Sequence, residues 1–248
     1  MSTRLTPGQI LRLLASVIAV LLLLHGVMVI AQYGFGDRGF LKLRALFDVN
    51  GEQNIPTLFS TVQLLFASGL LALVFAESRR TRHADRYYWL SLALVFAFLA
   101  CDEFCELHER LIGPLRRALH VTGALSFAWV IPYAGFVALF AAGYARFWWR
   151  LAPRIRRLFF LAGAIYVGGG IGMEMAGAAL FTAYGWESVQ FDAETMIEEG
   201  MEMFGVALLI YAVLSELQSR VQHLSVLLVP SSAAAGIPDE LTRGGRLE

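Results

Sequence analysis

The chain has 248 residues, of which 57% are hydrophobic and 16% are charged, and its formal net charge is zero. About a quarter of the residues in a soluble domain are charged, so this composition excludes an ordinary soluble enzyme and predicts a membrane protein. The balanced charge and the lack of a nucleotide-binding glycine motif give no indication of a nucleic-acid partner. The two cysteines, Cys101 and Cys105, lie one helical turn apart and do not suggest a disulfide framework.

Six apolar stretches reach the length of about 20 residues that a helix needs to cross a bilayer. In chain order they are Ile10–Gln32, Pro56–Phe75, Tyr87–Leu107, Leu125–Trp148, Leu158–Phe181 and Phe191–Leu214. The first is too long for a signal peptide and no cleavage site follows it, so we interpret it as a retained span. The sequence thus predicts an all-α integral membrane protein with a six-helix transmembrane domain over residues 1–217. The tail, residues 218–248, is polar and rich in Gly and Pro, and we expect it to be disordered from about residue 230.

The segment between the first and second spans carries its own pattern. Apolar and basic residues alternate from Phe40 to Phe47, which is typical of a short helix lying on the membrane surface. A turn signal, Asn50-Gly51-Glu52-Gln53-Asn54, then leads into the second span. Two interpretations remain open: a lid over the acidic residues described next, with Glu52 or Asn54 near them, or a plain connection, which we slightly favour.

Carboxylates interrupt three of the spans, at a depth where ionisable groups are costly and usually functional. The acidic positions and their neighbouring histidine are Asp102, Glu103, Glu106, His108 and Glu109 around the end of the third span, Glu174 in the fifth, and Glu194, Glu198, Glu199 and Glu202 in the sixth. On an ideal helix Asp102, Glu106 and Glu109 fall within about 60° of arc. Glu194, Glu198 and Glu202 fall within about 80°. We expect each set to share one helix face that points into the bundle.

The fifth span has the small residues that close packing needs. Gly168, Gly172 and Ala176 follow one another at four-residue spacing, a pattern that lets helix backbones approach. The triplet Gly168–Gly170 is also a place where this span could be broken.

Basic residues indicate the orientation. Of the 20 basic residues, 14 lie at the N-terminus, in the second-to-third and fourth-to-fifth loops and in the tail. We therefore expect both termini in the cytoplasm, and the protein in a bacterial inner membrane. At 1.5 Å per residue, Asp102 lies about 24 Å from Arg86 and Glu174 roughly 25 Å from Arg157. These helices should then deliver their acids to one layer, in the outer leaflet.

So many clustered carboxylates cannot all ionise in a layer of low dielectric constant, and Arg110 is the only base within a turn of them. We therefore expect divalent metal, with Fe, Mn or Zn favoured over Ca because imidazole accompanies the carboxylates. The predicted ligands are Asp102, Glu106, His108, Glu109, Glu174, Glu194, Glu198, Glu202 and, from the first span, His25. Glu103 and Glu199 are the candidate catalytic carboxylates. Two alternatives stay open: a structural hydrogen-bond network, and a soft site formed by Cys101, Cys105 and His108.

Carboxylates projecting from several helices into a bundle resemble the di-iron carboxylate four-helix proteins, whose signature is a Glu-x-x-His pair on each of two helices. This chain departs from that signature. Cys105 stands three residues before His108, and the fifth and sixth spans contain no histidine. The resemblance is one of chemistry, and no family follows from it.

Three classes of function fit these observations. We favour a membrane-embedded metal-dependent enzyme, a hydrolase or an oxidoreductase, acting on a lipid-like or quinone-like substrate, with a carboxylate as general base. The first alternative is a divalent-cation or proton-coupled transporter or channel, and the second is a structural or assembly subunit of a membrane complex. A transporter should carry acids at several depths, whereas Leu90–Ala100, Leu158–Gly172 and Gly205–Ser215 contain no charged residue. The sequence does not indicate an oligomeric state.

Overall fold

The computed structural model describes residues 5–36, 41–51 and 53–220, and in these ranges it is helical without a strand. Six of its helical segments are long and apolar enough to cross a membrane. They are α1 (Pro7–Phe35), α3 (Ile55–Arg80), α4 (Arg86–Cys105), α6 (Val130–Arg150), the segment Pro153–Tyr184, and α9 (Val189–Arg220). The prediction of an all-helical protein with six such stretches is confirmed. Phe40, Glu52 and the tail from residue 221 onward lie outside the described residues.

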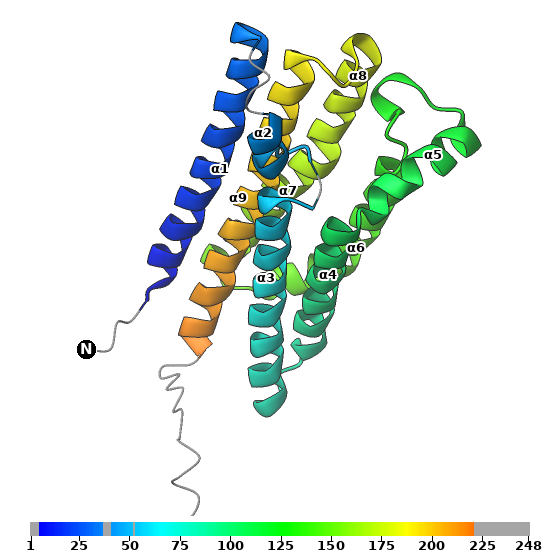
Figure 1. The fold of residues 1–248 in the computed structure, drawn as a ribbon. Coiled ribbons are helices and arrows are strands. Elements are labelled where there is room, and N and C mark those ends of the chain that lie inside the picture. Colours follow the sequence, from blue (N-terminus) through cyan, green and yellow to red (C-terminus); the bar gives the residue numbers. More distant parts are fainter. Residues whose placement is uncertain (1–4, 37–40, 52, 221–248) are drawn as a thin grey trace, which may run out of the picture.

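Helix α9 forms the centre of the bundle (Figure 1) and packs against α1, α3 and α7 (Pro153–Val167). Its apolar half enters the main core, where Ile210 and Val213 are fully buried with Trp89 of α4. Glycine makes the crossing with α7 close: a Cβ on Gly205 would lie 2.8 Å from the backbone nitrogen of Tyr166. Helix α6 is the least buried of the six segments.

The third span ends earlier than predicted. Helix α4 stops at Cys105 because Glu106 adopts a left-handed conformation (φ 54°, ψ 40°), and a separate helix, α5 (Leu107–Leu119), follows. A left-handed residue other than glycine costs about 1–2 kcal/mol. The side chain of Asp102 offsets part of this cost, because its Oδ1 accepts a hydrogen bond from the backbone N–H of His108 at 2.9 Å. The predicted common helix face of Asp102, Glu106 and Glu109 is therefore wrong.

The fourth and fifth spans also differ in detail. Helix α6 begins at Val130 rather than Leu125, after a 3-10 turn, η1 (Gly123–Leu125). The fifth span runs without a break through α7, a π-helix, η2 (Gly168–Met173), and α8 (Glu174–Tyr184). The glycine triplet therefore widens the helix instead of breaking it. Gly168 approaches α9 as predicted, since a Cβ there would lie 3.1 Å from Cε of Met201. Gly172 faces open space, so its predicted part in close packing is wrong, and Gly169 and Gly170 make the further contacts with α9.

The connection between the first two spans contains a helix, α2 (Leu41–Phe47). Its position at a membrane surface stays a prediction. Arg44 forms an ion pair with Asp48. Its Nη2 also donates to both carboxylate oxygens of Asp192 on α9, at 2.9 and 3.0 Å. Asn54 caps α3 by accepting the N–H of Thr57. The connection is therefore linked to α9 through Arg44 and to the start of α3 through Asn54.

Candidate functional site

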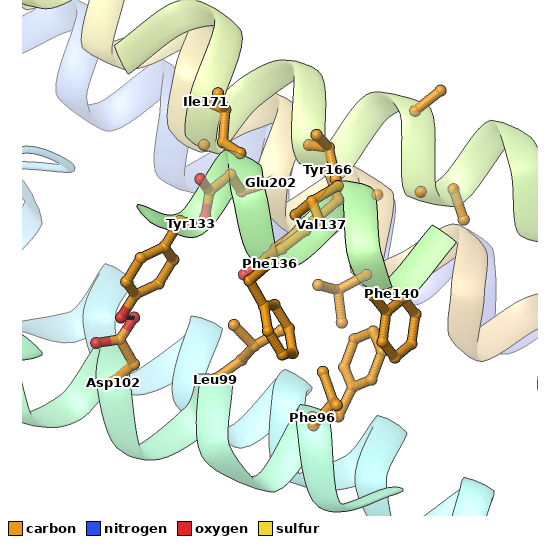
Figure 2. A pocket seen from close by; sticks show the side chains of 18 of the residues that line it. Phe96, Leu99, Asp102, Tyr133, Phe136, Val137, Phe140, Tyr166, Ile171 and Glu202 are labelled. Atoms are coloured by element: carbon orange, nitrogen blue, oxygen red, sulfur yellow. Dashed lines mark hydrogen bonds between the residues drawn. The ribbon is translucent and has the colours of Figure 1, made fainter. Parts of the chain in front are cut away.

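A large cavity lies between α4, α6, the segment α7–η2–α8 and α9. Its volume is 1190 Å³, above the 300–1,000 Å³ that is typical of pockets for small ligands. Figure 2 shows apolar side chains from facing helices projecting into it, and those labelled are Phe96, Leu99, Phe136, Val137, Phe140 and Ile171. The wall is therefore mostly hydrocarbon and suits a lipophilic molecule.

At one end of the cavity, which we call the acidic end, the apolar wall gives way to ionisable side chains. They come from α4, α5, α8 and α9, and are Asp102, Glu103, His108, Glu109, Glu174, Glu198, Glu199 and Glu202. The structure thus brings together residues from all three of the acid-bearing spans at one place. Electrostatic interactions link them: Glu202 interacts with Glu103, Asp102, Glu174 and His108.

Asp102 organises the first part of the acidic end. Besides the backbone of His108, it binds the imidazole, with Nδ1 of His108 3.3 Å from its Oδ2. The hydroxyl of Tyr133, on α6, donates to the same oxygen at 3.2 Å, and Figure 2 shows the two side chains meeting across the cavity. With Nδ1 turned to Asp102, Nε2 occupies the other edge of the ring, and His108 lines the cavity. Asp102 is therefore an orienting group for this histidine.

Glu174 and Glu198 form the second part. The indole N–H of Trp129 donates to Oε1 of Glu174 at 2.8 Å, and the same indole lies against His108, with ring centroids 4.8 Å apart. Glu198 interacts electrostatically with Glu174 and Glu202. Two adjoining carboxylates from different helices must share a proton or a cation, because both cannot carry an uncompensated charge.

Glycines on the π-helix and α8 leave the space that the carboxylates of α9 occupy. A Cβ on Gly170 would collide with Oε1 of Glu202, and a Cβ on Gly177 would lie 2.5 Å from Oε2 of Glu194. Glu194 is 5% exposed, lies beside the backbone of Gly177, and is not among the residues that line the cavity. A carboxylate buried in this way is stable only if it is protonated or bound to a cation.

His108 and Glu109 belong to α5, beyond the apolar stretch of α4. Burial lowers the pKa of His108, but its hydrogen bond to Asp102 and the charges of Asp102, Glu174 and Glu202 outweigh burial and raise the pKa to about 9. Burial raises the pKa of the Glu109 carboxyl, and the charges of Glu106 and Glu174 add to this effect, while His108 opposes it. At neutral pH the imidazole is therefore a cation and a hydrogen-bond donor.

Several predicted residues lie elsewhere. His25 is fully buried, but its Nδ1 lies 3.3 Å from Oδ1 of Asp48 and 3.3 Å from the backbone nitrogen of Val49, so it belongs to the α1–α2 junction. Glu106 accepts a hydrogen bond from Gln53 at 3.2 Å and is not among the lining residues of the cavity. Cys101 and Cys105 are both exposed.

The predicted metal site can be compared with the positions of its ligands in the structure. In the ranges that the structure describes, no three Asp, Glu, His or Cys side chains converge as ligands around one point. A metal ion at the acidic end would therefore require the carboxylates to turn toward a common centre. Metal binding and the ligand assignments stay predictions.

Sequence reasoning missed the two aromatic partners, Trp129 and Tyr133. They lie four residues apart, on one face at the start of the fourth span, and each donates a hydrogen bond to a carboxylate. The signal that was available is this spacing of hydrogen-bonding aromatic residues at the same end of the bundle as the acids.

The chain belongs to a family described as a domain of unknown function (DUF8692), whose model matches residues 13–217. The match begins within α1 and ends within α9, and it includes every residue of the acidic end. No curated protein and no solved structure matches the chain. The class of protein is therefore defined by the helices and the site: an all-helical protein with six potential membrane spans and a cavity that ends in carboxylates.

Proposed function

We propose that the protein is a membrane-embedded metal-dependent enzyme, a hydrolase or an oxidoreductase, acting on a lipid-like or quinone-like substrate. One observation carries the proposal: a cavity of 1190 Å³ with hydrocarbon walls ends at one histidine and a group of carboxylates, two of which, Asp102 and Glu198, are buried. The walls would hold the lipophilic part of a substrate, and the acidic end would meet its reacting part.

The donor set fits a divalent cation in its chemistry. Carboxylates outnumber the single imidazole, and His108 is a positively charged neighbour of Glu103 and Glu202. A histidine that holds a metal through one ring nitrogen generally donates the other to a carboxylate. His108 has this arrangement with Asp102, so we assign Asp102 as a positioning residue and His108, Glu174, Glu198 and Glu202 as ligands. A metal at Nε2 of His108 would replace the proton that this nitrogen carries in the metal-free protein. The metal would polarise a substrate oxygen or activate water.

Two carboxylates remain for proton transfer. Glu103 lines the cavity and hydrogen bonds with Ser60 of α3, and Glu199 also lines it. A general base must lie within hydrogen-bond reach of the proton that it removes. Both residues meet the first condition for this role, which is access to the cavity.

The transporter alternative finds less support. Away from the acidic end the cavity runs along apolar residues such as Leu92, Phe147 and Leu151, which offer an ion no ligands. The glycine triplet, which could have broken the fifth span at the site of an ion path, forms a continuous π-helix. In sealed vesicles we therefore expect no uptake of Mn, Fe, Zn or Ca by the wild-type protein.

Elemental analysis of protein purified without chelator tests the proposal. We expect at least one Fe, Mn or Zn ion per chain, and loss of that metal in Glu174→Gln and in Glu202→Gln. The matched control is Glu187→Gln, because Glu187 is an exposed acid outside the cavity lining. Folded wild-type protein with less than one tightly bound metal ion per chain would remove the metal from the proposal. Ion flux that disappears in Glu174→Gln would favour the transporter.

A further inference from the structure

Helices α4 and α6 are tied together at two levels and separated between them. At the acidic end, Tyr133 of α6 donates to Asp102 of α4. Toward the other end, the Tyr144 hydroxyl donates to the backbone oxygen of Tyr88 at 3.1 Å and hydrogen bonds with Ser91. Tyr133 and Tyr144, like Ser91 and Asp102, are 11 residues apart in the sequence, which is about 16 Å along a helix.

The stretch between these ties opens sideways. Leu94 and Phe98 on α4 and Phe136 on α6 line the cavity, yet they are 62%, 51% and 55% exposed. In a membrane, a side chain exposed at this height faces lipid tails. Between the two ties, the cavity lining therefore reaches the surface of the bundle, and we call this stretch the α4–α6 window.

The shape of the cavity favours a long, thin occupant. Its lining follows α6 from Trp129 at the acidic end to Trp149, a separation of about 30 Å along the helix. Small residues keep the interior open: Ala141 and Ala145 on α6 line the same cavity as Gly163 and Ala164 on α7. A Cβ on Gly163 would meet nothing within 4 Å.

We propose that the cavity binds the unbranched acyl or alkyl chain of a membrane lipid, which enters through the α4–α6 window and places its polar end among the carboxylates. The inference names the substrate class of the proposed enzyme. Its catalytic part rests on the proposed function, whereas the binding of the chain does not. Binding needs no metal, so it can be measured on its own.

The test uses full-length protein in phosphatidylcholine vesicles that contain a long-chain alcohol with a diazirine in its chain. After irradiation, we expect labelled peptides from 92–99 of α4 and 133–141 of α6. In Gly163→Phe, which fills the cavity, labelling of these peptides should fall about tenfold, a loss equivalent to the burial of roughly two methylene groups. Gly143→Phe is the matched control, since Gly143 also has nothing within 4 Å of its Cβ but does not line the cavity; its labelling should equal that of the wild type.

Labels found only on outward faces of α1 and α3 would mean annular lipid only and would overturn the inference. Unchanged labelling in Gly163→Phe would overturn it as well. If that variant does not fold, Ala141→Phe takes its place. Protein that is labelled but binds no metal would support the lipid site and contradict the metal-dependent enzyme. Protein that binds metal but is not labelled would support the enzyme and contradict the lipid site.

Discussion

Replacing one glycine of the π-helix by alanine tests whether the position of the Glu202 carboxylate depends on the missing side chain at residue 170. Alanine in place of a helical glycine stabilises a protein by about 0.5–1 kcal/mol when its Cβ meets no obstacle. Gly172 is such a position, because nothing lies within 4 Å of its Cβ, and it belongs to the same π-helix. In Gly170→Ala the new Cβ collides with Oε1 of Glu202, and forcing that side chain from its rotamer costs about 0.5–1.5 kcal/mol.

The two variants should therefore differ by about 1 kcal/mol, which is roughly 2–4 °C in Tm for a chain of this size. We expect Gly172→Ala to unfold above the wild type and Gly170→Ala at or below it, measured by thermal unfolding in the same detergent. Metal retention should fall in Gly170→Ala alone. Equal melting temperatures for the two variants would refute the argument that Gly170 makes room for Glu202.

Two further predictions concern the Trp129–Glu174 hydrogen bond and the contacts of Asp48. Trp129→Phe removes the hydrogen bond to Glu174 while keeping an aromatic ring, and should lower the free energy of unfolding by about 1–3 kcal/mol, seen in chemical denaturation; an unchanged midpoint would mean that the bond contributes nothing. At Asp48, burial raises the carboxyl pKa, but the hydrogen bond from His25 and the ion pair with Arg44 outweigh burial and lower it. The ionised form thus stabilises the fold above the ordinary Asp value of about 3.9, and this contribution is lost as the pH falls through the lower folded-state pKa. Asp48→Asn should flatten the loss of stability in that acid range, and a variant with the wild-type acid profile would contradict the assignment.

The spans were predictable because a bilayer demands a minimum apolar length, and no other signal in this chain competes with it. The sequence also predicted that acids from distant segments lie close together, because helix rise converts residue number into depth along each span. Asp102, Glu174 and Glu202 line the same end of one cavity for this reason.

Other features depend on contacts that a sequence pattern does not contain. The left-handed conformation of Glu106 divides the third span from α5, and it is supported by a hydrogen bond from His108 to a side chain six residues earlier. His25 contacts Asp48, which lies in the connection between α1 and α3. The cavity itself was invisible, because Phe136 would be equally apolar facing a lipid tail or a bound ligand.

The π-helix sets the direction in which Glu174 points. Eight residues separate Tyr166 from Glu174, and in an unbroken α-helix such residues point about 80° apart. A π-turn absorbs one extra residue, which brings the two to within about 20° of each other, and both line the cavity. The π-helical conformation of the glycine run therefore matters as much as the small size of its residues. If the same residues formed ordinary α-helix in place of the π-turn, Glu174 would rotate by about 100° relative to α7, turning the carboxylate away from the cavity without changing any side chain at the acidic end.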